Sequence, residues 1–195
     1  MKIVVVSQRI DFYPNRDEKR DALDQRLIKF LIMAGYLPIT VPNSLGNKIK
    51  EWIANIPISA IVLSGGNNIG ECPDRDETEL NMLNYAFNHR LPLLGICRGM
   101  QMIAHWSGTK LHSVKGHANT SHRITGEINE EVNSYHLFSL LNCPKNFEIL
   151  AKSEDGEIEA IRHKSLKWEG WMWHPERMDK FTTTDIDRIR VLFDG

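Results

Sequence analysis

The sequence is poor in cysteine and contains no long apolar run. Its three cysteines, Cys72, Cys97 and Cys143, show no paired spacing, so they predict no disulfide framework and favour a reducing compartment. No apolar run approaches the roughly 20 residues that a membrane-spanning helix needs. The apolar start of the chain is also too short for a signal peptide. We therefore expect a cytoplasmic protein that does not bind membranes.

The sequence also lacks an excess of charge of either sign. Its 24 Lys and Arg residues nearly balance 25 Asp and Glu residues, and the formal net charge is −1. This balance does not predict a surface that binds nucleic acid. Internal repeats, low-complexity segments and linkers are absent as well. Because 195 residues are enough for one sizeable core, we expect a single domain over residues 1–195.

Apolar segments alternate with amphipathic segments in the first half of the chain. The predicted strands are Ile3–Ser7, Leu37–Val41, Ala60–Leu63 and the apolar run that starts at Leu91. Helices are predicted from a cap at Asp21 to Met33, over residues 48–54 and over Asp76–His89, and a loop is predicted over Gln8–Asp21. The alternation predicts an α/β fold, with a mostly parallel sheet and helices on both faces. Ligands of such sheets bind at the carboxyl ends of the strands.

The pattern changes after Gly108. Residues Thr109–Asn142 are polar, and short strands are predicted at Phe147–Ala151, Ile158–Arg162 and Trp168–Trp173, followed by a helix that is capped at Thr182 or Thr183 and ends at Phe193. These strands predict a small antiparallel extension of the sheet. Along the last strand, Trp171 and Trp173 share one face, and we expect both in the core.

The segment Gly95-Ile96-Cys97-Arg98-Gly99 joins an apolar run to residues with helical spacing. Gly-x-Cys-x-Gly is the cysteine form of the nucleophile elbow, a tight turn between strand and helix that exposes a reactive atom. Cys97 would lie at a helix N-terminus, whose positive end favours the thiolate. A lone cysteine is more often a small core residue, but the two flanking glycines favour a nucleophile.

A base for this nucleophile is predicted at the end of the last strand, where His174-Pro175-Glu176 follows Trp173. A histidine at this position can reach a cysteine at the end of a neighbouring strand, and a glutamate two residues later can orient the far imidazole nitrogen. Taken alone, His-Pro-Glu is typical of a solvated turn. Together with the elbow it predicts a Cys97–His174–Glu176 catalytic triad.

These motifs resemble the class I glutamine amidotransferase superfamily, which includes glutaminase domains and γ-glutamyl hydrolases. The resemblance rests on Gly-Ile-Cys-Arg-Gly-Met-Gln at 95–101, the Gly65-Gly66 loop upstream and His174-Pro175-Glu176 downstream, and it extends over nearly the whole chain. It implies a flavodoxin-like sheet and a γ-glutamyl thioester on Cys97 that water hydrolyses.

The resemblance also implies roles for further residues. The backbone amides of Gly66 and Arg98 match the oxyanion hole. The side chain of Gln101 matches a position that holds the glutamyl moiety, and Gly65 belongs to the same substrate site. The segment Val132–His136, with Asn133, Ser134 and Tyr135, matches a loop whose backbone receives the α-amino and α-carboxylate groups; a plain turn is the alternative.

The choice of branch within the superfamily stays open. Arg98 directly after the nucleophile, together with residues 132–136, favours the γ-glutamyl hydrolases, and the overall likeness is to small bacterial enzymes of sugar and capsule gene clusters. The substrate expected on this basis is γ-glutamyl-CDP-amidate, which would yield glutamate and cytidine diphosphoramidate. Arg9 and Arg123 are candidates to bind the leaving group.

The alternatives are a glutaminase subunit that passes ammonia to a separate synthase partner, and a non-catalytic regulatory domain on the same scaffold. A homodimer is also compatible with the sequence. No cofactor is expected. His112, His117 and His122 recur at intervals of five residues rather than the four of helical zinc pairs, with no cysteine or carboxylate cluster beside them, so we expect no metal.

Overall fold

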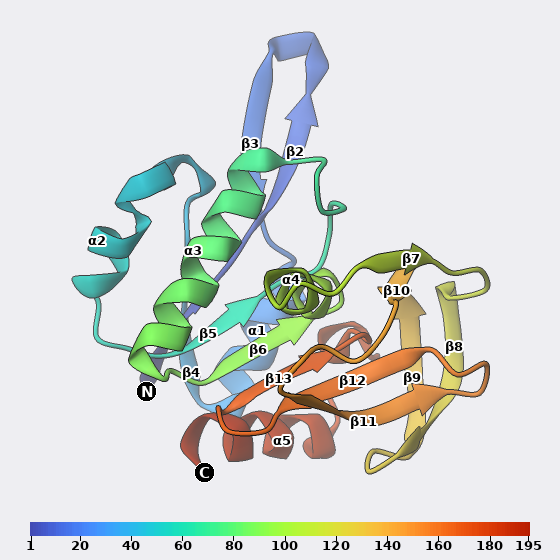
Figure 1. The fold of residues 1–195 in the computed structure, drawn as a ribbon. Helices are drawn as coiled ribbons and strands as arrows, with labels where there is room; N and C mark the ends of the chain where they lie inside the picture. The colour runs from blue at the N-terminus through green and yellow to red at the C-terminus, as the bar shows by residue number, and fades with distance from the viewer.

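The computed structural model describes all 195 residues and is built around one nine-stranded sheet (Figure 1), with the order β4-β1-β5-β6-β13-β12-β11-β8-β9. The first five strands are parallel: β4 (Tyr36–Thr40), β1 (Lys2–Val6), β5 (Ile58–Leu63), β6 (Leu93–Ile96) and β13 (Trp168–Trp171). The other four continue the sheet in antiparallel pairing: β12 (Ile158–His163), β11 (Phe147–Ser153), β8 (Ala118–Gly126) and β9 (Glu130–Tyr135). The predicted α/β class, with a mostly parallel sheet and an antiparallel extension, is confirmed.

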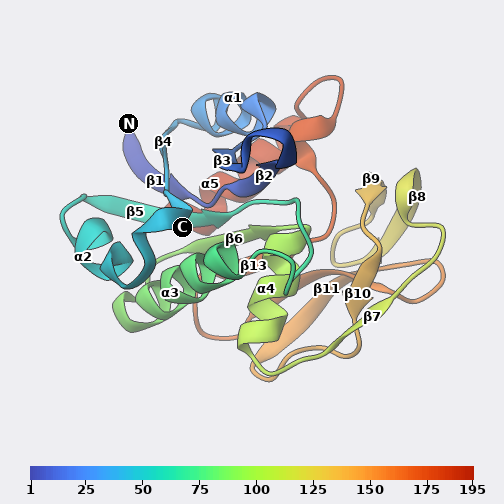
Figure 2. The same cartoon turned by 90° about the horizontal axis from the view of Figure 1, so that it is seen from above.

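Helices cover both faces of the parallel half (Figure 2). On one face α1 (Gln25–Ala34) packs with α5 (Thr183–Asp194), and on the other lie α2 (Ile49–Ala54), α3 (Pro73–His89) and α4 (Arg98–Trp106). Short 3-10 turns occupy Pro14–Arg16, Asn43–Lys48 and Pro175–Arg177. None of the helices combines the length and the apolar character that a bilayer-spanning segment requires.

The alternation of side chains along the strands divides the core into two layers. In β1, Val4 and Val6 belong to the layer under α1 and α5, whereas Val5 belongs to the layer under α2, α3 and α4. Trp171 and Trp173 share the first layer as predicted, where their rings stack with centroids 5.3 Å apart.

Two helix boundaries agree with the sequence and two do not. Gly35, the predicted stop of the first helix, adopts φ 103, and the Thr182 side chain caps α5. The first helix, however, begins after Asp24 rather than Asp21, because the Asp24 carboxylate accepts the N–H of Arg26 at 2.9 Å. The helix predicted from Asp76 already begins at Pro73, a residue that suits a first helical position.

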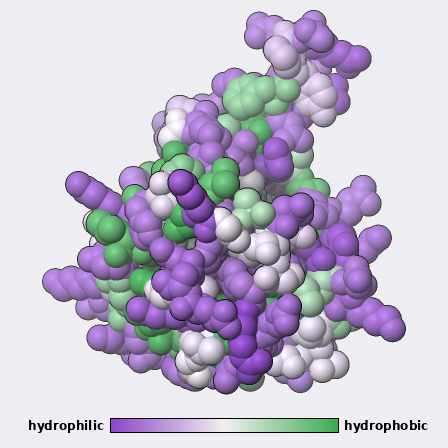
Figure 3. All heavy atoms as spheres, turned by 90° about the vertical axis from the view of Figure 1, so that its right-hand side faces the viewer, coloured by the Kyte–Doolittle hydropathy of each residue, from purple (hydrophilic) through white to green (hydrophobic).

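The loop predicted over residues 8–21 is instead a hairpin of β2 (Arg9–Tyr13) and β3 (Glu18–Ala22). Asp17 ends its turn in the left-handed region, with φ 47. The hairpin stands out from the body of the molecule (Figure 3), so most of its residues are exposed on both faces and their sequence lacks the apolar alternation that signals a strand.

The polar segment 109–142 also contains strands that its composition did not predict. Besides β8 and β9, it forms the two-stranded sheet of β7 (Leu111–Ser113) and β10 (Phe138–Leu140). The predicted substrate loop 132–136 therefore lies mainly in β9. Its polar residues Asn133 and Ser134 are buried because partners from other parts of the chain satisfy their hydrogen bonds.

Close packing of α4 on the sheet depends on Gly95 and Gly99. A Cβ atom on Gly99 would lie 2.2 Å from the carbonyl oxygen of Leu63 in β5, and one on Gly95 would lie 2.5 Å from the backbone of Gly99. These contacts are with backbone atoms that cannot move aside cheaply, so neither position accepts a side chain without displacing α4.

We expect Gly99→Ala to destabilise the fold by about 1–3 kcal/mol, because the added methyl group forces α4 away from β5. Urea unfolding followed by circular dichroism measures the change. His105→Ala, at an exposed position of the same helix, is the matched control and should unfold close to wild type. An unchanged midpoint for Gly99→Ala would contradict this account of the packing.

Candidate functional site

Cys97 lies in the turn between β6 and α4 and has an unusual backbone conformation. Its φ of 50 and ψ of −105 are outside the regions that residues with a side chain normally adopt. The turn is held by two hydrogen bonds: Cys97 N donates to Trp171 O in β13 at 2.7 Å, and Gln101 N donates to Cys97 O at 3.1 Å. The strand, tight turn and helix predicted around the cysteine are therefore present.

His174 and Glu176 follow β13, the strand beside β6, and both are buried. His174 Nδ1 lies 2.7 Å from Glu176 Oε1, and the imidazole also contacts the Cys97 side chain. Parallel strands end at the same edge of a sheet, and this arrangement brings together the three residues of the predicted triad. The Glu176 carboxylate is placed to keep the proton of the imidazole on Nδ1.

The charges around His174 favour its protonated form. Burial disfavours the imidazolium, but interactions with the Glu176 carboxylate and with the Cys97 side chain outweigh it and raise the pKa of His174 to about 9. At neutral pH the site therefore contains an imidazolium that is able to donate a proton to a leaving group.

Asn133 holds the backbone of His174 from β9. Its Nδ2 donates to His174 O at 2.8 Å, and its Oδ1 accepts from His174 N at 2.9 Å. The side chain assigned to the substrate site from sequence is thus occupied in positioning the predicted base. The sequence carried no signal for this role, because the two residues are 41 positions apart.

The Gly65-Gly66 loop passes directly beside His174. A Cβ atom on Gly65 would lie 2.6 Å from His174 Cε1, so the imidazole occupies the space that any side chain there would need. Gly66 adopts φ 87, a conformation that glycine tolerates best.

Arg75 fixes the orientation of this loop from the protein interior. Its guanidinium donates to Ser64 O at 2.8 Å, to Gly65 O at 3.0 Å and also to Gly66 O. In a trans peptide the C=O and the next N–H point in opposite directions. With Gly65 O turned toward Arg75, the N–H of Gly66 faces away from it, as a donor of an oxyanion hole requires.

The side chain of Arg98 also points inward. It pairs with Asp76 and with Glu79, and Glu79 is shared with Arg75, whose Nε lies 3.0 Å from Glu79 Oε1. Burial opposes ionisation of Glu79, but Arg98 and Arg75 outweigh it and lower the pKa of this carboxyl. Only the backbone of Arg98 is left to face a substrate. Sequence reasoning missed Arg75 and Glu79 because charged residues four apart on a helix usually form a surface pair.

Gln101, Ser134 and Tyr135 were also assigned to the glutamyl site, and each side chain has a different partner. Gln101 Nε2 donates to Phe138 O in β10 at 2.9 Å, and Ser134 Oγ donates to His117 O. The Tyr135 ring meets the His174 ring edge-on, with centroids 5.6 Å apart. Of these three side chains, only that of Tyr135 contacts the predicted base.

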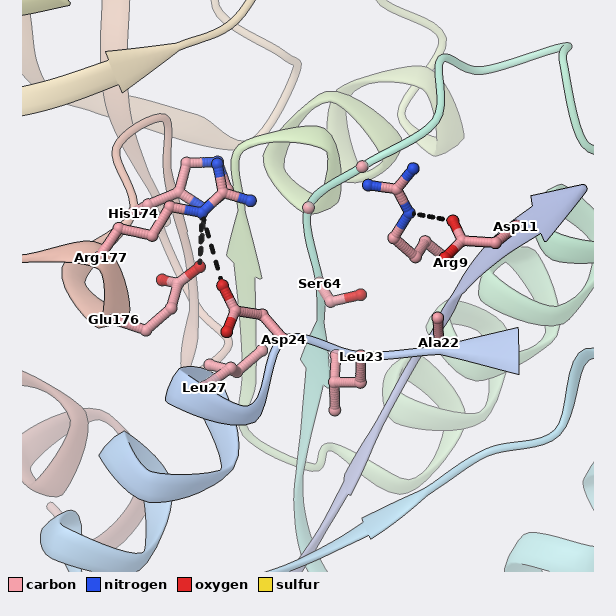
Figure 4. A pocket seen from close by; sticks show the side chains of 12 residues that line it. Arg9, Asp11, Ala22, Leu23, Asp24, Leu27, Ser64, His174, Glu176 and Arg177 are labelled. Carbon is pink, nitrogen blue, oxygen red and sulfur yellow. Dashed lines mark hydrogen bonds and ion pairs between the residues drawn. The ribbon is translucent and has the colours of Figure 1, made fainter. Parts of the chain in front are cut away.

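Arg9 and Arg177 line a cavity of about 240 Å³ next to Gly65, Gly66 and His174 (Figure 4). Arg9 Nε pairs with Asp11 at 2.7 Å, and its side chain lies against Gly66. Arg177 Nε lies 3.8 Å from Asp24 Oδ2 and 3.9 Å from Glu176 Oε1. Sequence reasoning missed Arg177, although it directly follows His174-Pro175-Glu176.

Arg123, the second candidate for the leaving group, is placed elsewhere. It is exposed on β8, where its guanidinium donates to Asn129 Oδ1 at 2.9 Å, and it does not line the cavity that contains Arg9.

Comparison with known proteins places this site in a family. Residues 19–188 match the family model described as glutamine amidotransferase class-I. The chain is 33% identical over 190 residues to γ-glutamyl-CDP-amidate hydrolase of Campylobacter jejuni, covering 93% of each protein. It is 33% identical over 148 residues to a subunit of the glutamine-hydrolysing GMP synthase of Methanococcus aeolicus, covering 70% of this chain and 73% of that protein.

Solved structures agree on the fold. The crystal structure of a glutamine amidotransferase from Thermotoga maritima superposes with a TM-score of 0.67 at 17% identity, covering 90% of this chain and 76% of that one. A proposed GMP synthase subunit from Thermoplasma acidophilum superposes with a TM-score of 0.74 at 21% identity, covering 99% of this chain and 93% of that one.

As the motifs predicted, the chain belongs to the class I glutamine amidotransferase family, and it is an amide-hydrolysing enzyme of the glutaminase and γ-glutamyl hydrolase type.

Proposed function

We propose that this enzyme hydrolyses a γ-glutamyl amide through a γ-glutamyl thioester on Cys97. The observation that carries the proposal is the contact between a cysteine in a strained turn and a buried histidine whose far nitrogen lies 2.7 Å from a buried glutamate. Such a chain of nucleophile, base and orienting carboxylate serves acyl transfer.

In the first half-reaction the Cys97 sulfur attacks the γ-carbonyl carbon. The N–H groups of Gly66 and Arg98 stabilise the oxyanion of the tetrahedral intermediate. His174 then donates its proton to the leaving nitrogen, the C–N bond breaks and the thioester remains. In the second half-reaction His174 takes a proton from water and the resulting hydroxide attacks the thioester. The C–S bond then breaks, the sulfur leaves as a thiolate beside the His174 imidazolium, and the new carboxyl group of glutamate releases its proton to solvent.

The substrate we propose is γ-glutamyl-CDP-amidate, with glutamate and cytidine diphosphoramidate as products and a role in capsule biosynthesis. Two observations support it. The Campylobacter jejuni hydrolase named for that substrate matches 93% of this chain. The cavity beside the Gly65-Gly66 loop contains Arg9 and Arg177, whose planar guanidinium groups suit a diphosphate.

A second function has support from a different group of relatives. GMP synthase subunits from Methanococcus and Methanocaldococcus species are 30–33% identical to this chain over 70–78% of its length. A glutaminase subunit of this kind would release ammonia to a separate synthase, and Cys97, His174 and Glu176 would keep their roles. The two functions differ in the leaving group and in the need for a partner.

We expect the isolated enzyme to release glutamate from γ-glutamyl-CDP-amidate without any other protein. Cys97→Ala should reduce the rate by at least about 10³-fold, because no acyl-enzyme can form. Coupled detection of glutamate measures the rate, and mass spectrometry of acid-quenched enzyme should detect a γ-glutamyl adduct on Cys97 of the wild type. Activity that requires an added synthase would favour the subunit function. Full activity of Cys97→Ala would refute both.

The raised pKa of His174 predicts the pH profile. We expect kcat/KM to fall as pH rises through about 9, where the imidazolium loses the proton it gives to the leaving group. Because the folded pKa lies above the usual 6.5, the protonated ring stabilises the fold fully below pH 6.5, and this stabilisation is lost as pH rises through about 9.

Glu176→Gln removes the carboxylate that stabilises the imidazolium. It should move the alkaline limb to lower pH and reduce kcat by about 10²- to 10⁴-fold. Stopped-time assays at pH values from about 6 to about 10 measure both effects, because this range includes the expected transition. Glu131→Gln, at an exposed position of β9, is the control. An alkaline limb that stays in place in Glu176→Gln would contradict the assigned coupling.

The cavity predicts which arginine recognises the leaving group. Arg9→Ala should raise KM for γ-glutamyl-CDP-amidate on the order of tenfold, as expected for loss of a charge-assisted hydrogen bond, and should leave glutamine hydrolysis nearly unchanged. Steady-state kinetics with both substrates measure the difference. Arg123→Ala is the matched control, and a larger effect there would place the diphosphate on β8 instead. Equal losses with both substrates would argue against a role in leaving-group binding.

A further inference from the structure

Three residues outside the catalytic site meet in the antiparallel half of the molecule. His117 directly precedes β8, His136 lies between β9 and β10, and Glu159 lies in β12, and each is at most 3% exposed. His117 Nδ1 lies 3.2 Å from His136 Nε2, and both nitrogens lie 3.3 Å from Glu159 Oε1. Two imidazoles and a carboxylate from three separate segments thus point their polar atoms at one another.

The far nitrogens of both rings are already bonded to acceptors. His117 Nε2 lies 2.9 Å from the Asp155 carboxylate, and His136 Nδ1 lies 3.1 Å from the carbonyl oxygen of Phe138. Oxygens of this kind only accept, so the far nitrogens carry the protons. In the neutral rings, His117 Nδ1 and His136 Nε2 therefore face each other with lone pairs.

The carboxylate between these lone pairs also has no donor. Neither Oε1 nor Oε2 of Glu159 accepts a hydrogen bond, although both are buried. A buried carboxylate next to two lone pairs is expensive unless a cation neutralises it. This environment is electrostatically suited to a metal ion.

The spacing of the three atoms matches zinc. Zinc binds imidazole nitrogen and carboxylate oxygen at about 2.0–2.2 Å in a tetrahedron, whose edges are then about 3.3–3.6 Å. The observed sides of 3.2, 3.3 and 3.3 Å correspond to one face of such a tetrahedron. Histidine and carboxylate are ligands that zinc accepts, and the Asp155 carboxylate behind His117 is the outer contact that typically orients a zinc-bound histidine.

His122 lies beside this group but outside the set of three atoms that face one another. Its Nε2 lies 3.5 Å from Glu159 Oε1 and is buried without a hydrogen-bond partner, and its ring lies edge-on to His117 with centroids 4.8 Å apart. We propose that His117, His136 and Glu159 bind one zinc ion. Three protein ligands leave the fourth position of the tetrahedron to a water molecule.

This ion would connect the antiparallel strands to the catalytic site. It joins the residue directly before β8, the β9–β10 connection and β12, and the neighbouring Ser134 Oγ already bonds His117 O. Asn133, the next residue of β9, holds the backbone of His174, and Phe138 O accepts from both His136 and Gln101. The sequence predicted no metal because the histidines recur at intervals of five residues with no cysteine or carboxylate cluster beside them. His136 and Glu159 join His117 only in the fold.

Metal analysis of the protein without an affinity tag tests the proposal. After expression with added zinc and gel filtration, we expect about one zinc per chain by plasma mass spectrometry. Dialysis against a chelator should lower the thermal midpoint by about 5–10 °C, and zinc alone should restore it. Cobalt added to the stripped protein should give the visible absorption bands of a tetrahedral site.

Variants identify the ligands. Glu159→Gln and His136→Ala should lose most of the zinc, whereas His112→Ala, at a histidine that pairs with Glu157 outside the cluster, should retain it. Wild-type protein that neither contains zinc nor gains stability when zinc is added would overturn the proposal, and a protonated histidine–glutamate network would then explain the cluster. The stripped wild type gives a clear result even if the variants fold poorly. The test measures metal content and thermal stability, so its outcome does not depend on which substrate the enzyme hydrolyses.

Discussion

The structure depends on the close approach of α4 to β5 and β6, which Gly95 and Gly99 allow. A side chain on Gly99 would collide with the carbonyl of Leu63 at 2.2 Å. With the helix this near the sheet, the chain must turn within one residue, and Cys97 takes a positive φ. The packing of the core thus sustains the strain at the cysteine, as is common at functional sites.

A buried charge network supports this turn and the loop opposite it. Glu79 lies between Arg75 and Arg98, so two cations compensate one buried carboxylate. Arg75 uses its remaining donors on three consecutive carbonyls of the Gly65-Gly66 loop, and Arg98 is the residue after Cys97. The two proposed oxyanion donors are therefore connected through a single glutamate. Such satisfied networks in a low-dielectric interior hold backbone groups rigidly.

The antiparallel half supplies the support for His174. Asn133 in β9 bonds both backbone groups of His174, and Tyr135 packs against its ring. The cluster of His117, His136 and Glu159 joins three segments of this half, and Ser134 of β9 donates a hydrogen bond to His117 O. The parallel half presents the proposed nucleophile, and the antiparallel half holds the proposed base beside it.

The sequence by itself determined the strands of the parallel half, the elbow around Cys97 and the residues His174 and Glu176. These features have local signatures, namely apolar runs, glycines flanking the turn and a short motif after a strand. Only the tertiary structure decided the exposed β2–β3 hairpin, the clamp of Asn133 on His174, the inward direction of Arg98 and the meeting of Glu159 with three histidines. Each of these arises between segments distant in sequence, or from polar residues that become buried only because a distant partner satisfies them. Local patterns of hydrophobicity do not predict such distant partners.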